Sequence, residues 1–247
     1  MLFGDTGWHL PKGFDRTCTQ TNCSLWYQGV ELLPRDLGLD SGGKLTIRPI
    51  PEIANYRQPG SLRSVTNLTA DNAALHATIV AKGSLLELQL NCSGRPVKGA
   101  RDSVGMHVLA TADHTSFTVV GFNFTNNRLF VDHRSSSPGA NSTVVQTAPL
   151  DIKSAIAGTS ATDAPTTIEL VCLVDNALVE SFANGEVAIS SWVAEVMGDA
   201  SPTADERVVF LVPPPKGVHC TFKSWSLEPL AAAVMKRVMK TDDLTIG

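Results

Sequence analysis

Apolar and polar residues alternate along several short segments of the chain, with the period of β-strands that bury one face. Leu86, Leu88 and Leu90 alternate with polar residues, and the same period continues through Thr167–Asp175. Other short runs rich in β-branched or aromatic residues are Lys44–Ile50, Met106–Ala110, Ser116–Phe122, Arg128–Asp132, Val187–Val193, Arg207–Val212 and Val218–Lys223. The pattern predicts an all-β protein.

Turn-forming residues separate these runs at a spacing of roughly ten residues, which is typical of a sandwich or a barrel. The turn stretches are Ser41–Gly43, Asn91–Gly94, Asn126–Asn127, Ser135–Gly139 and Asn184–Gly185. Asn184 and Gly185 lie between two apolar runs, and both residues tolerate the positive φ that a type I′ turn requires. We therefore expect a β-hairpin that joins Leu178–Phe182 to Val187–Ser191.

Helical signals are sparse. Ala73–His76 is too short to predict a helix, whereas apolar residues at spacings of three and four between Leu227 and Val238 predict a short terminal helix. A helix lying on a membrane surface is the alternative for this segment. No apolar run has the roughly 18 residues of a membrane span, and the first residues lack the pattern of a signal peptide.

Composition limits the class of partner. Hydrophobic residues make up 43% of the chain and charged residues 18%, which favours a packed core over disorder. The formal net charge is −4. Because no basic stripe is available for phosphates, we expect no nucleic-acid partner.

The chain has five cysteines, so at least one has no partner within it. Cys18 and Cys23 lie close together in a loop, where they could close a small disulfide or remain free. Their spacing matches no zinc site. Cys172 lies on an apolar strand and is expected to be a buried thiol.

Five Asn-x-Ser/Thr sequons point to a glycoprotein of the secretory route, extracellular or vacuolar. The acceptor residues are Asn22, Asn67, Asn91, Asn123 and Asn141. The alternative is coincidence in a chain rich in Ser and Thr.

Residues that could carry chemistry form no clear site. The histidines (His9, His76, His107, His114, His133 and His219) are scattered, and no helical pair predicts a metal or Cys/His site. Asp175 and Glu180 are the best local pair of carboxyls for glycoside hydrolysis. We favour a structural reading, in which Asp175 belongs to a turn and Glu180 points outward from a hairpin. No catalytic residue, cofactor or metal is therefore expected.

Tryptophans can stack on sugar rings, so Trp8, Trp26, Trp192 and Trp225 are candidates for carbohydrate contact. Packing in a core or an interface is the favoured reading. Trp26 and Tyr27 lie in a loop-rich start that needs a partner surface to cover its aromatic side chains.

Three ordered stretches resemble glycoside hydrolase family 32, the invertases and fructan hydrolases. Leu33–Leu37, with Arg35 and Asp36, resembles the junction between the two domains of that family. Leu129–Asp132, before a Ser-rich turn, resembles the strand that carries an Asp-Arg-Ser pattern, although His133 intrudes between Asp132 and Arg134. Leu173–Gly185 resembles a late hairpin of the family; its motif residues are Asp175, Glu180, Phe182 and Gly185.

The resemblance implies a two-sheet antiparallel β-sandwich that follows a five-bladed β-propeller. We expect residues 1–34 to end the propeller, residues 35–229 to form the sandwich and residues 230–247 to form a tail. The propeller of the family carries its catalytic Asp and Glu residues in Asn-Asp-Pro, Arg-Asp-Pro and Glu-Cys motifs, and none of these occurs here. Arg35-Asp36 is followed by Leu37 instead of proline.

The function implied is that of a supporting domain in a glycosidase that hydrolyses O-glycosyl bonds of sucrose or fructans. Without its propeller partner, the chain is expected to be inactive. A stand-alone carbohydrate-binding or interaction module is the alternative. A degenerate remnant is a third reading, and the regular alternation through Thr167–Asp175 argues against it, because drift soon places polar residues inside a core.

Overall fold

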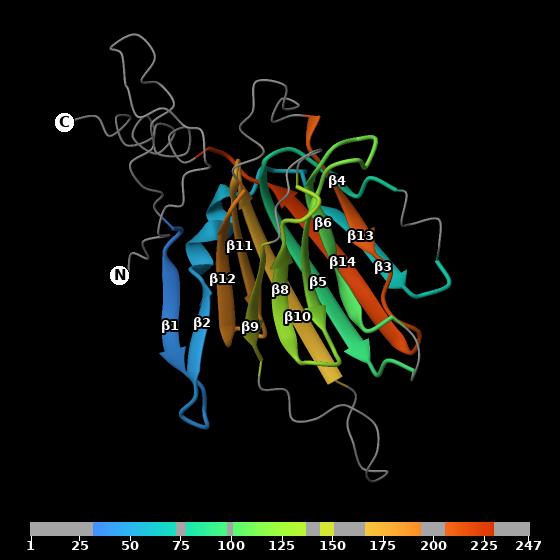
Figure 1. Ribbon diagram of the computed structural model, residues 1–247. Coiled ribbons are helices and arrows are strands. Elements are labelled where there is room, and N and C mark those ends of the chain that lie inside the picture. Colours follow the sequence, from blue (N-terminus) through green and yellow to red (C-terminus); the bar gives the residue numbers. More distant parts are fainter. Residues whose placement is uncertain are drawn as a thin grey trace, which may run out of the picture.

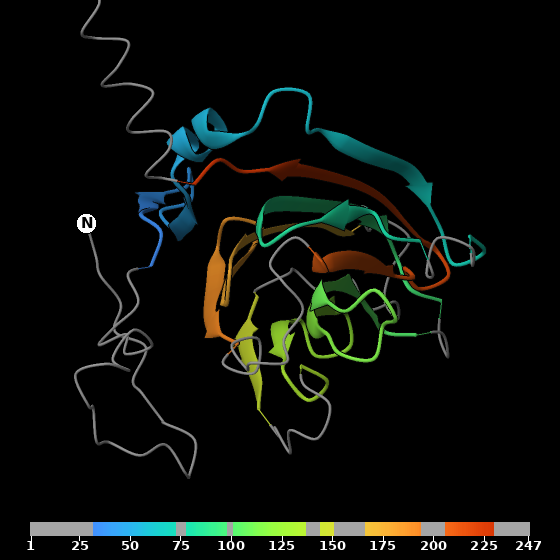
Figure 2. The same cartoon turned by 90° about the horizontal axis from the view of Figure 1, so that it is seen from above.

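The computed structural model describes residues 32–72, 78–97, 101–136, 144–150, 166–193 and 206–229. Two six-stranded antiparallel sheets pack face to face, and a separate two-stranded hairpin lies beside them (Figures 1 and 2). The predicted two-sheet β-sandwich is confirmed. Cys18 and Cys23, Ala73–His76, Trp8, Trp26 and the segment from residue 230 onward lie outside the described residues.

The first sheet has the strand order β12-β11-β10-β5-β14-β3. Its strands are β3 (Arg63–Leu68), β5 (Leu85–Gly94), β10 (Thr166–Asp175), β11 (Leu178–Ala183), β12 (Val187–Trp192) and β14 (Val218–Ser226). β5 and β10 pair along their whole length, from Leu85 opposite Asp175 to Gly94 opposite Thr166. These two long strands form the centre of the sheet.

The second sheet has the order β4-β13-β6-β7-β8-β9. Its strands are β4 (Ala81–Lys82), β6 (Ser103–Ala110), β7 (Thr118–Asn123), β8 (Arg128–Asp132), β9 (Val145–Pro149) and β13 (Val208–Val212). The hairpin consists of β1 (Arg35–Leu39) and β2 (Leu45–Pro49), and the short 3-10 helix η2 (Pro51–Tyr56) follows it.

The main core lies between the two sheets, as strand alternation requires. Leu86, Leu88 and Leu90 point inward from β5, and Ile168 and Leu170 do so from β10; each is at most 2% exposed. The facing sheet contributes Val104, Met106, Val108, Val120, Phe122, Leu129 and Val131. At one side β12 lies against β8 and β9, and Ser191 donates a hydrogen bond to Gln146 there.

The predicted hairpin at Asn184–Gly185 is confirmed. β11 and β12 pair as expected, with φ of 52° at Asn184 and 63° at Gly185. The N–H of Glu186 donates to the carbonyl of Ala183 at 2.9 Å and closes the turn. Turns also occur at Ser41–Gly43 and Asn126–Asn127.

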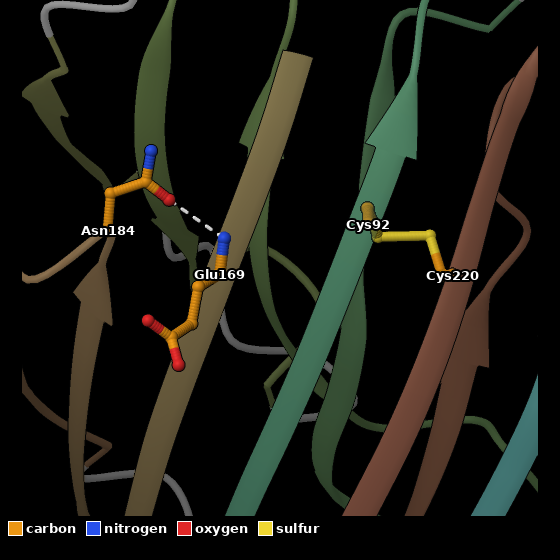
Figure 3. The surroundings of a disulfide bond; sticks show 4 residues. All are labelled: Cys92, Glu169, Asn184 and Cys220. Carbon is orange, nitrogen blue, oxygen red and sulfur yellow. Dashed lines mark hydrogen bonds between the residues drawn. A yellow bond between two sulfur atoms is a disulfide. The ribbon is translucent and has the colours of Figure 1, made fainter. Parts of the chain in front are cut away.

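The predicted turn at Asn91–Gly94 is wrong, because this segment continues β5 to its end. Cys92 explains the difference: it faces the core and forms a disulfide with Cys220 on β14. The two cysteines lie directly opposite each other in the ladder, and Figure 3 shows the bond between the neighbouring strands. Pairing with β10 on one side and β14 on the other keeps this segment extended despite its turn-forming residues.

Several strands gave no clear sequence signal. β3 is an edge strand whose pairing with β14 shifts register, and Asn67 adopts a positive φ of 55° within it. Such a bulge breaks the alternation on which the prediction depends. β1 and β9 carry mostly exposed or half-buried residues, so little of their sequence is fixed by a core.

Cys172 is buried and free, as predicted. Burial raises the pKa of its thiol to about 12, so the residue stays protonated at neutral pH and is unreactive.

We predict that replacing Cys92 and Cys220 by alanine lowers the free energy of unfolding by about 2–5 kcal/mol, because the bond joins residues 128 positions apart in sequence. Urea denaturation of the wild-type and variant chains measures the difference. Wild-type protein that has been reduced should match the variant; equal stability of the oxidised and reduced wild-type chains would contradict the prediction.

Candidate functional site

The β1–β2 hairpin and η2 cover part of the outer face of the first sheet and form a second, smaller core there. Ile53 of η2, Leu173 of β10 and Phe182 of β11 are its buried members. Leu33, Ile47, Ile50, Val171, Ala188 and Leu227 pack around them. All six residues of β11 are therefore buried, because the strand has one core on each face.

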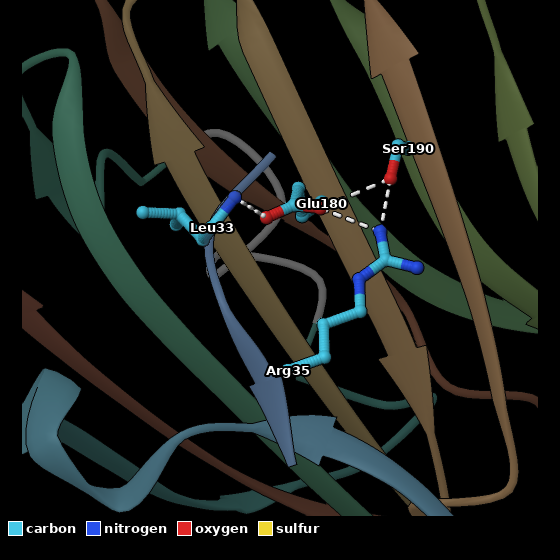
Figure 4. A network of polar contacts seen from close by, with 4 residues as sticks. All are labelled: Leu33, Arg35, Glu180 and Ser190. Carbon is cyan, nitrogen blue, oxygen red and sulfur yellow. Dashed lines mark hydrogen bonds and ion pairs between the residues drawn. The ribbon is translucent and has the colours of Figure 1, made fainter. Parts of the chain in front are cut away.

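A buried carboxyl fastens this hairpin to the sheet. Glu180 on β11 is fully buried, and its Oε1 accepts a hydrogen bond from Nη2 of Arg35 at 2.5 Å. Its Oε2 accepts from the backbone N–H of Leu33 at 3.0 Å. Ser190 on β12 donates to Oε1 at 3.0 Å and accepts from Arg35 (Figure 4). The Arg35 guanidinium lies 5.5 Å from the centre of the Phe182 ring.

Glu180 was expected to be an outward residue on a hairpin, and its side chain is instead fully buried. The side chain points away from the main core, as alternation predicts, but the hairpin closes over it. Asp175 lies on the same outer side of β10, and its Oδ1 accepts from the Asn176 amide at 2.9 Å. Burial raises the pKa of Asp175. Since Glu180 is occupied by Arg35 and has no access to solvent, these two carboxyls form no site for hydrolysis.

A second ion pair lies farther along the same outer face. Arg57, just after η2, donates two hydrogen bonds to Glu87 on β5, at 2.7 Å from Nε and 2.6 Å from Nη2. Gln89 donates to the same carboxyl at 2.8 Å. The Arg57 guanidinium stacks 3.9 Å from the ring centre of Trp225 on β14. The Glu87 hydrogen bond raises the pKa of Arg57, so this cation is held charged and in place.

A pocket of about 180 Å³ lies between this ion pair and the hairpin. The lining residues come from the β2–η2 segment, from β5, β10 and β11, and from the turn after β11. The polar or charged ones are Arg48, Arg57, Glu87, Gln89 and Glu169, and the apolar ones include Ile53, Val171 and Phe182. Gly185 forms part of the rim. A side chain at Gly185 would meet Arg48, since an added Cβ would lie 2.3 Å from its Nε.

Asn184 precedes Gly185 and contacts the neighbouring strand β10. Its side-chain Oδ1 accepts from the backbone N–H of Glu169 at 2.8 Å (Figure 3). Its Nδ2 donates to the carbonyl of Thr167. The Asn184 side chain therefore takes the place of a backbone partner for β10. The Glu169 carboxyl extends free of this contact (Figure 3).

The Asp132–Arg134 pair forms although His133 intrudes between the two residues. Nε of Arg134 lies 3.0 Å from both carboxyl oxygens of Asp132, and Nη2 lies 2.6 Å from Oδ2. Burial alone would raise the pKa of Asp132, but the hydrogen bonds from Arg134 outweigh it and lower the pKa. The arginine itself is exposed, so this pair borders a surface turn.

The remaining motif and sequon residues are spread over the molecule. Asp36 is exposed on β1, opposite Arg48 in the ladder. Asn67 is exposed, whereas Asn91 and Asn123 are half-buried. The Asn123 amide donates to Asp102 at 3.0 Å. Asn22 and Asn141 lie outside the described residues.

The fold brings together two histidines that look unrelated in sequence. Nδ1 of His107 on β6 and Nε2 of His114 are 2.6 Å apart. Phe117 stacks on His107 at 4.2 Å between ring centres, and Phe210 of β13 stacks on His114 at the same distance. Burial, followed by the charges of His114 and Arg101, lowers the pKa of His107 to about 4. The separation of the two histidines in sequence could not reveal the pair. They lie seven residues apart, and a turn between them brings the two rings together.

Among the described residues, no group of three or more His, Cys, Asp or Glu side chains is placed to hold a metal ion. In the same part of the chain, no helix has the length and apolar character to cross a membrane.

Comparison with known proteins identifies relatives of this sandwich. A family model described as "Glycosyl hydrolases family 32 C terminal" matches residues 52–203. A search of curated protein sequences gives no match.

Solved structures share the fold. An exo-inulinase from Aspergillus awamori is 18% identical, with a TM-score of 0.58 over 81% of this chain and 36% of its own. A fructan 1-exohydrolase IIa from Cichorium intybus is also 18% identical, with a TM-score of 0.59 over 81% of this chain and 41% of its own. A β-fructofuranosidase from Schwanniomyces occidentalis is 14% identical, with a TM-score of 0.56 and the same coverage of 81% and 41%. The chain thus spans less than half the length of each of these structures.

We predict that Glu180→Ala lowers the free energy of unfolding by about 3–5 kcal/mol, because it leaves the partly buried Arg35 guanidinium without its carboxylate. The matched control is Glu186→Ala, which removes the partly exposed pair between Glu186 and Lys44. The control should cost less than about 1 kcal/mol. Urea denaturation measures both, and equal losses would contradict the prediction.

The histidine pair predicts acid sensitivity. The pKa of His107 is about 4 in the folded chain, below the ordinary histidine value of 6.5, so the unfolded chain binds a proton more readily. This contribution to stability is present above pH 6.5 and is lost as the pH falls toward 4. Allowing for the partial exposure of His107, we expect a loss of roughly 1–2 kcal/mol.

His107→Gln removes this contribution while all other titrating groups remain. Unfolding free energies at pH 7 and pH 4.5 should therefore differ less in the variant than in the wild-type chain. An identical pH dependence of the two proteins would show that His107 does not contribute.

Proposed function

The chain belongs to glycosyl hydrolases family 32, through its C-terminal domain, and from this premise we propose that it is the β-sandwich that braces a catalytic β-propeller. The match over residues 52–203 is the observation that carries the proposal. The resemblance implies that the catalytic carboxyls lie in the propeller. None of their motifs occurs in this chain, so we infer that the chain alone does not cleave sugars.

The proposed substrates are sucrose or fructans. The supporting observation is that solved structures of similar fold include an exo-inulinase, a fructan 1-exohydrolase and a β-fructofuranosidase. The chain spans less than half of each of these structures, and we infer that the choice among substrates belongs to the propeller. We also propose that residues 1–34 end the propeller, residues 35–229 form the sandwich and residues 230–247 form a tail.

The β1–β2 hairpin offers the surface for the propeller. Leu37 and Leu39 lie on the face of β1 that carries Arg35, and Leu45 pairs with Leu39 from β2. These three leucines are 42%, 71% and 57% exposed. Apolar side chains gathered on a two-stranded sheet mark an interaction surface. The hairpin docks onto the sandwich with the face that carries Arg35. The three exposed leucines extend this face, and the propeller would cover them.

A passage through the secretory route fits the chemistry of the chain. A disulfide persists in oxidising compartments and is rare in the cytosol, and Cys92–Cys220 joins two neighbouring strands of the core. Asn67, in a sequon, is exposed on the edge strand β3. We therefore propose an extracellular or vacuolar glycoprotein.

The bracing role is tested by co-expressing the chain with the propeller segment encoded next to it in the full transcript. We predict co-purification and hydrolysis of sucrose or inulin by the pair, whereas the chain alone releases no fructose. Leu39→Asp and Leu45→Asp should reduce recovery of the pair at least tenfold, since a buried charge opposes apolar docking.

Leu62→Asp is the control, because Leu62 is similarly exposed, at 49%, but lies outside the hairpin. A transcript without a propeller segment, or recovery that all three variants reduce equally, would refute the bracing role.

A further inference from the structure

We propose that the pocket between the β2–η2 segment and the outer face of the first sheet binds one sugar unit of a neutral carbohydrate. The pocket is distinct from the buried Glu180 network, and it is lined by both hydrogen-bonding and apolar side chains. Its volume of about 180 Å³ lies below the ~300–1,000 Å³ of sites for drug-sized ligands. A ligand of one ring therefore suits it better than an extended chain.

The charges of the lining favour a neutral ligand. Arg57 is neutralised by the two hydrogen bonds that it donates to Glu87. Arg48 and Glu169 carry the remaining two charges, which are opposite in sign. Because the pocket has no net charge, neither a phosphate nor an ammonium group would gain a net electrostatic advantage there.

The hydrogen-bonding groups match hydroxyls that both donate and accept. Among the described residues, the Arg48 guanidinium and the Glu169 carboxyl form no hydrogen bond or ion pair with other side chains. Arginine supplies only donors, a carboxylate supplies only acceptors, and the Gln89 carbonyl adds a further acceptor. Neighbouring hydroxyls on one ring can satisfy such a mixed set.

The apolar part of the lining suits the C–H face of a sugar ring. Phe182, Val171 and Ile53 belong to both the small core and the pocket wall. Since the core fixes these side chains, the apolar surface is formed before any ligand arrives, which reduces the cost of ordering on binding.

The polar wall is also held in place. Trp225 and Glu87 together fix Arg57, and Gly185 leaves the space that the Arg48 guanidinium occupies. The Asn184 side chain holds the Glu169 backbone. The choice of a fructose-containing sugar as the ligand rests on the proposed function, whereas the affinity for a neutral ring rests on the pocket alone.

Saturation-transfer NMR of the full 247-residue chain with fructose, sucrose and an inulin trisaccharide tests the proposal. We expect transfer to at least one of these sugars, together with shifts of the Gln89 side-chain amide signals. Glu169→Gln and Arg48→Met should each weaken binding by roughly tenfold or more, because the first removes the charge from a hydrogen-bond acceptor and the second removes a charged donor.

The matched control is Glu52→Gln, which removes the same charge from an exposed position on η2 outside the pocket lining. This variant should bind as the wild-type chain does. Absence of transfer to all three sugars, or binding that survives both pocket substitutions, would overturn the proposal. Binding of inorganic phosphate in preference to the sugars would also overturn it. These results are independent of co-purification with a propeller, so failure of the pocket and failure of the bracing role can be told apart.

Discussion

The arrangement of the outer face depends on the buried carboxylate of Glu180. An ionised carboxyl that is taken out of water must be paired and hydrogen-bonded, and Arg35, Ser190 and the N–H of Leu33 meet that demand. Two of these partners lie in or beside β1, so the hairpin must dock on the sheet for the charge to be tolerated. The polar contact thereby fixes where the hairpin lies, while the contacts around Phe182 bury apolar surface between the hairpin and the sheet.

Docking of the hairpin also creates the pocket. The chain that leaves β2 turns into η2 over the open part of the sheet, and Arg57 at its end pairs with Glu87 on β5. Arg35 of β1 thus holds the hairpin on the sheet, and Arg57 holds the C-terminal end of the β2–η2 segment. Between them the segment spans the sheet without filling the space beneath it, which leaves Gln89 and Glu169 accessible. Support for a hairpin and formation of a polar pocket are therefore consequences of the same contacts.

The sandwich could be predicted from the sequence because its long central strands alternate regularly, as Thr167–Asp175 does. The hairpin at Asn184–Gly185 could be predicted because both residues accept a positive φ. The end of β5 at Asn91–Gly94 could not be predicted, because its residue types are typical of a turn. The disulfide that Cys92 forms there joins it to Cys220, which is distant in sequence. β3 was missed because its bulge at Asn67 interrupts the period.

The candidate sites were harder to predict than the fold. Alternation along a strand predicts the direction in which a side chain points, but it does not predict which distant residues bury that side chain. Glu180 alternates outward correctly, yet its burial depends on Arg35, 145 residues away. The same limit applies to Arg57 with Glu87 and to His107 with His114, whose partners are brought close only by sheet pairing or by a turn. Family motifs partly bridge this gap: Arg35, Glu180, Phe182 and Gly185 come from two distant motifs, and together they form one contact between the hairpin and the sheet.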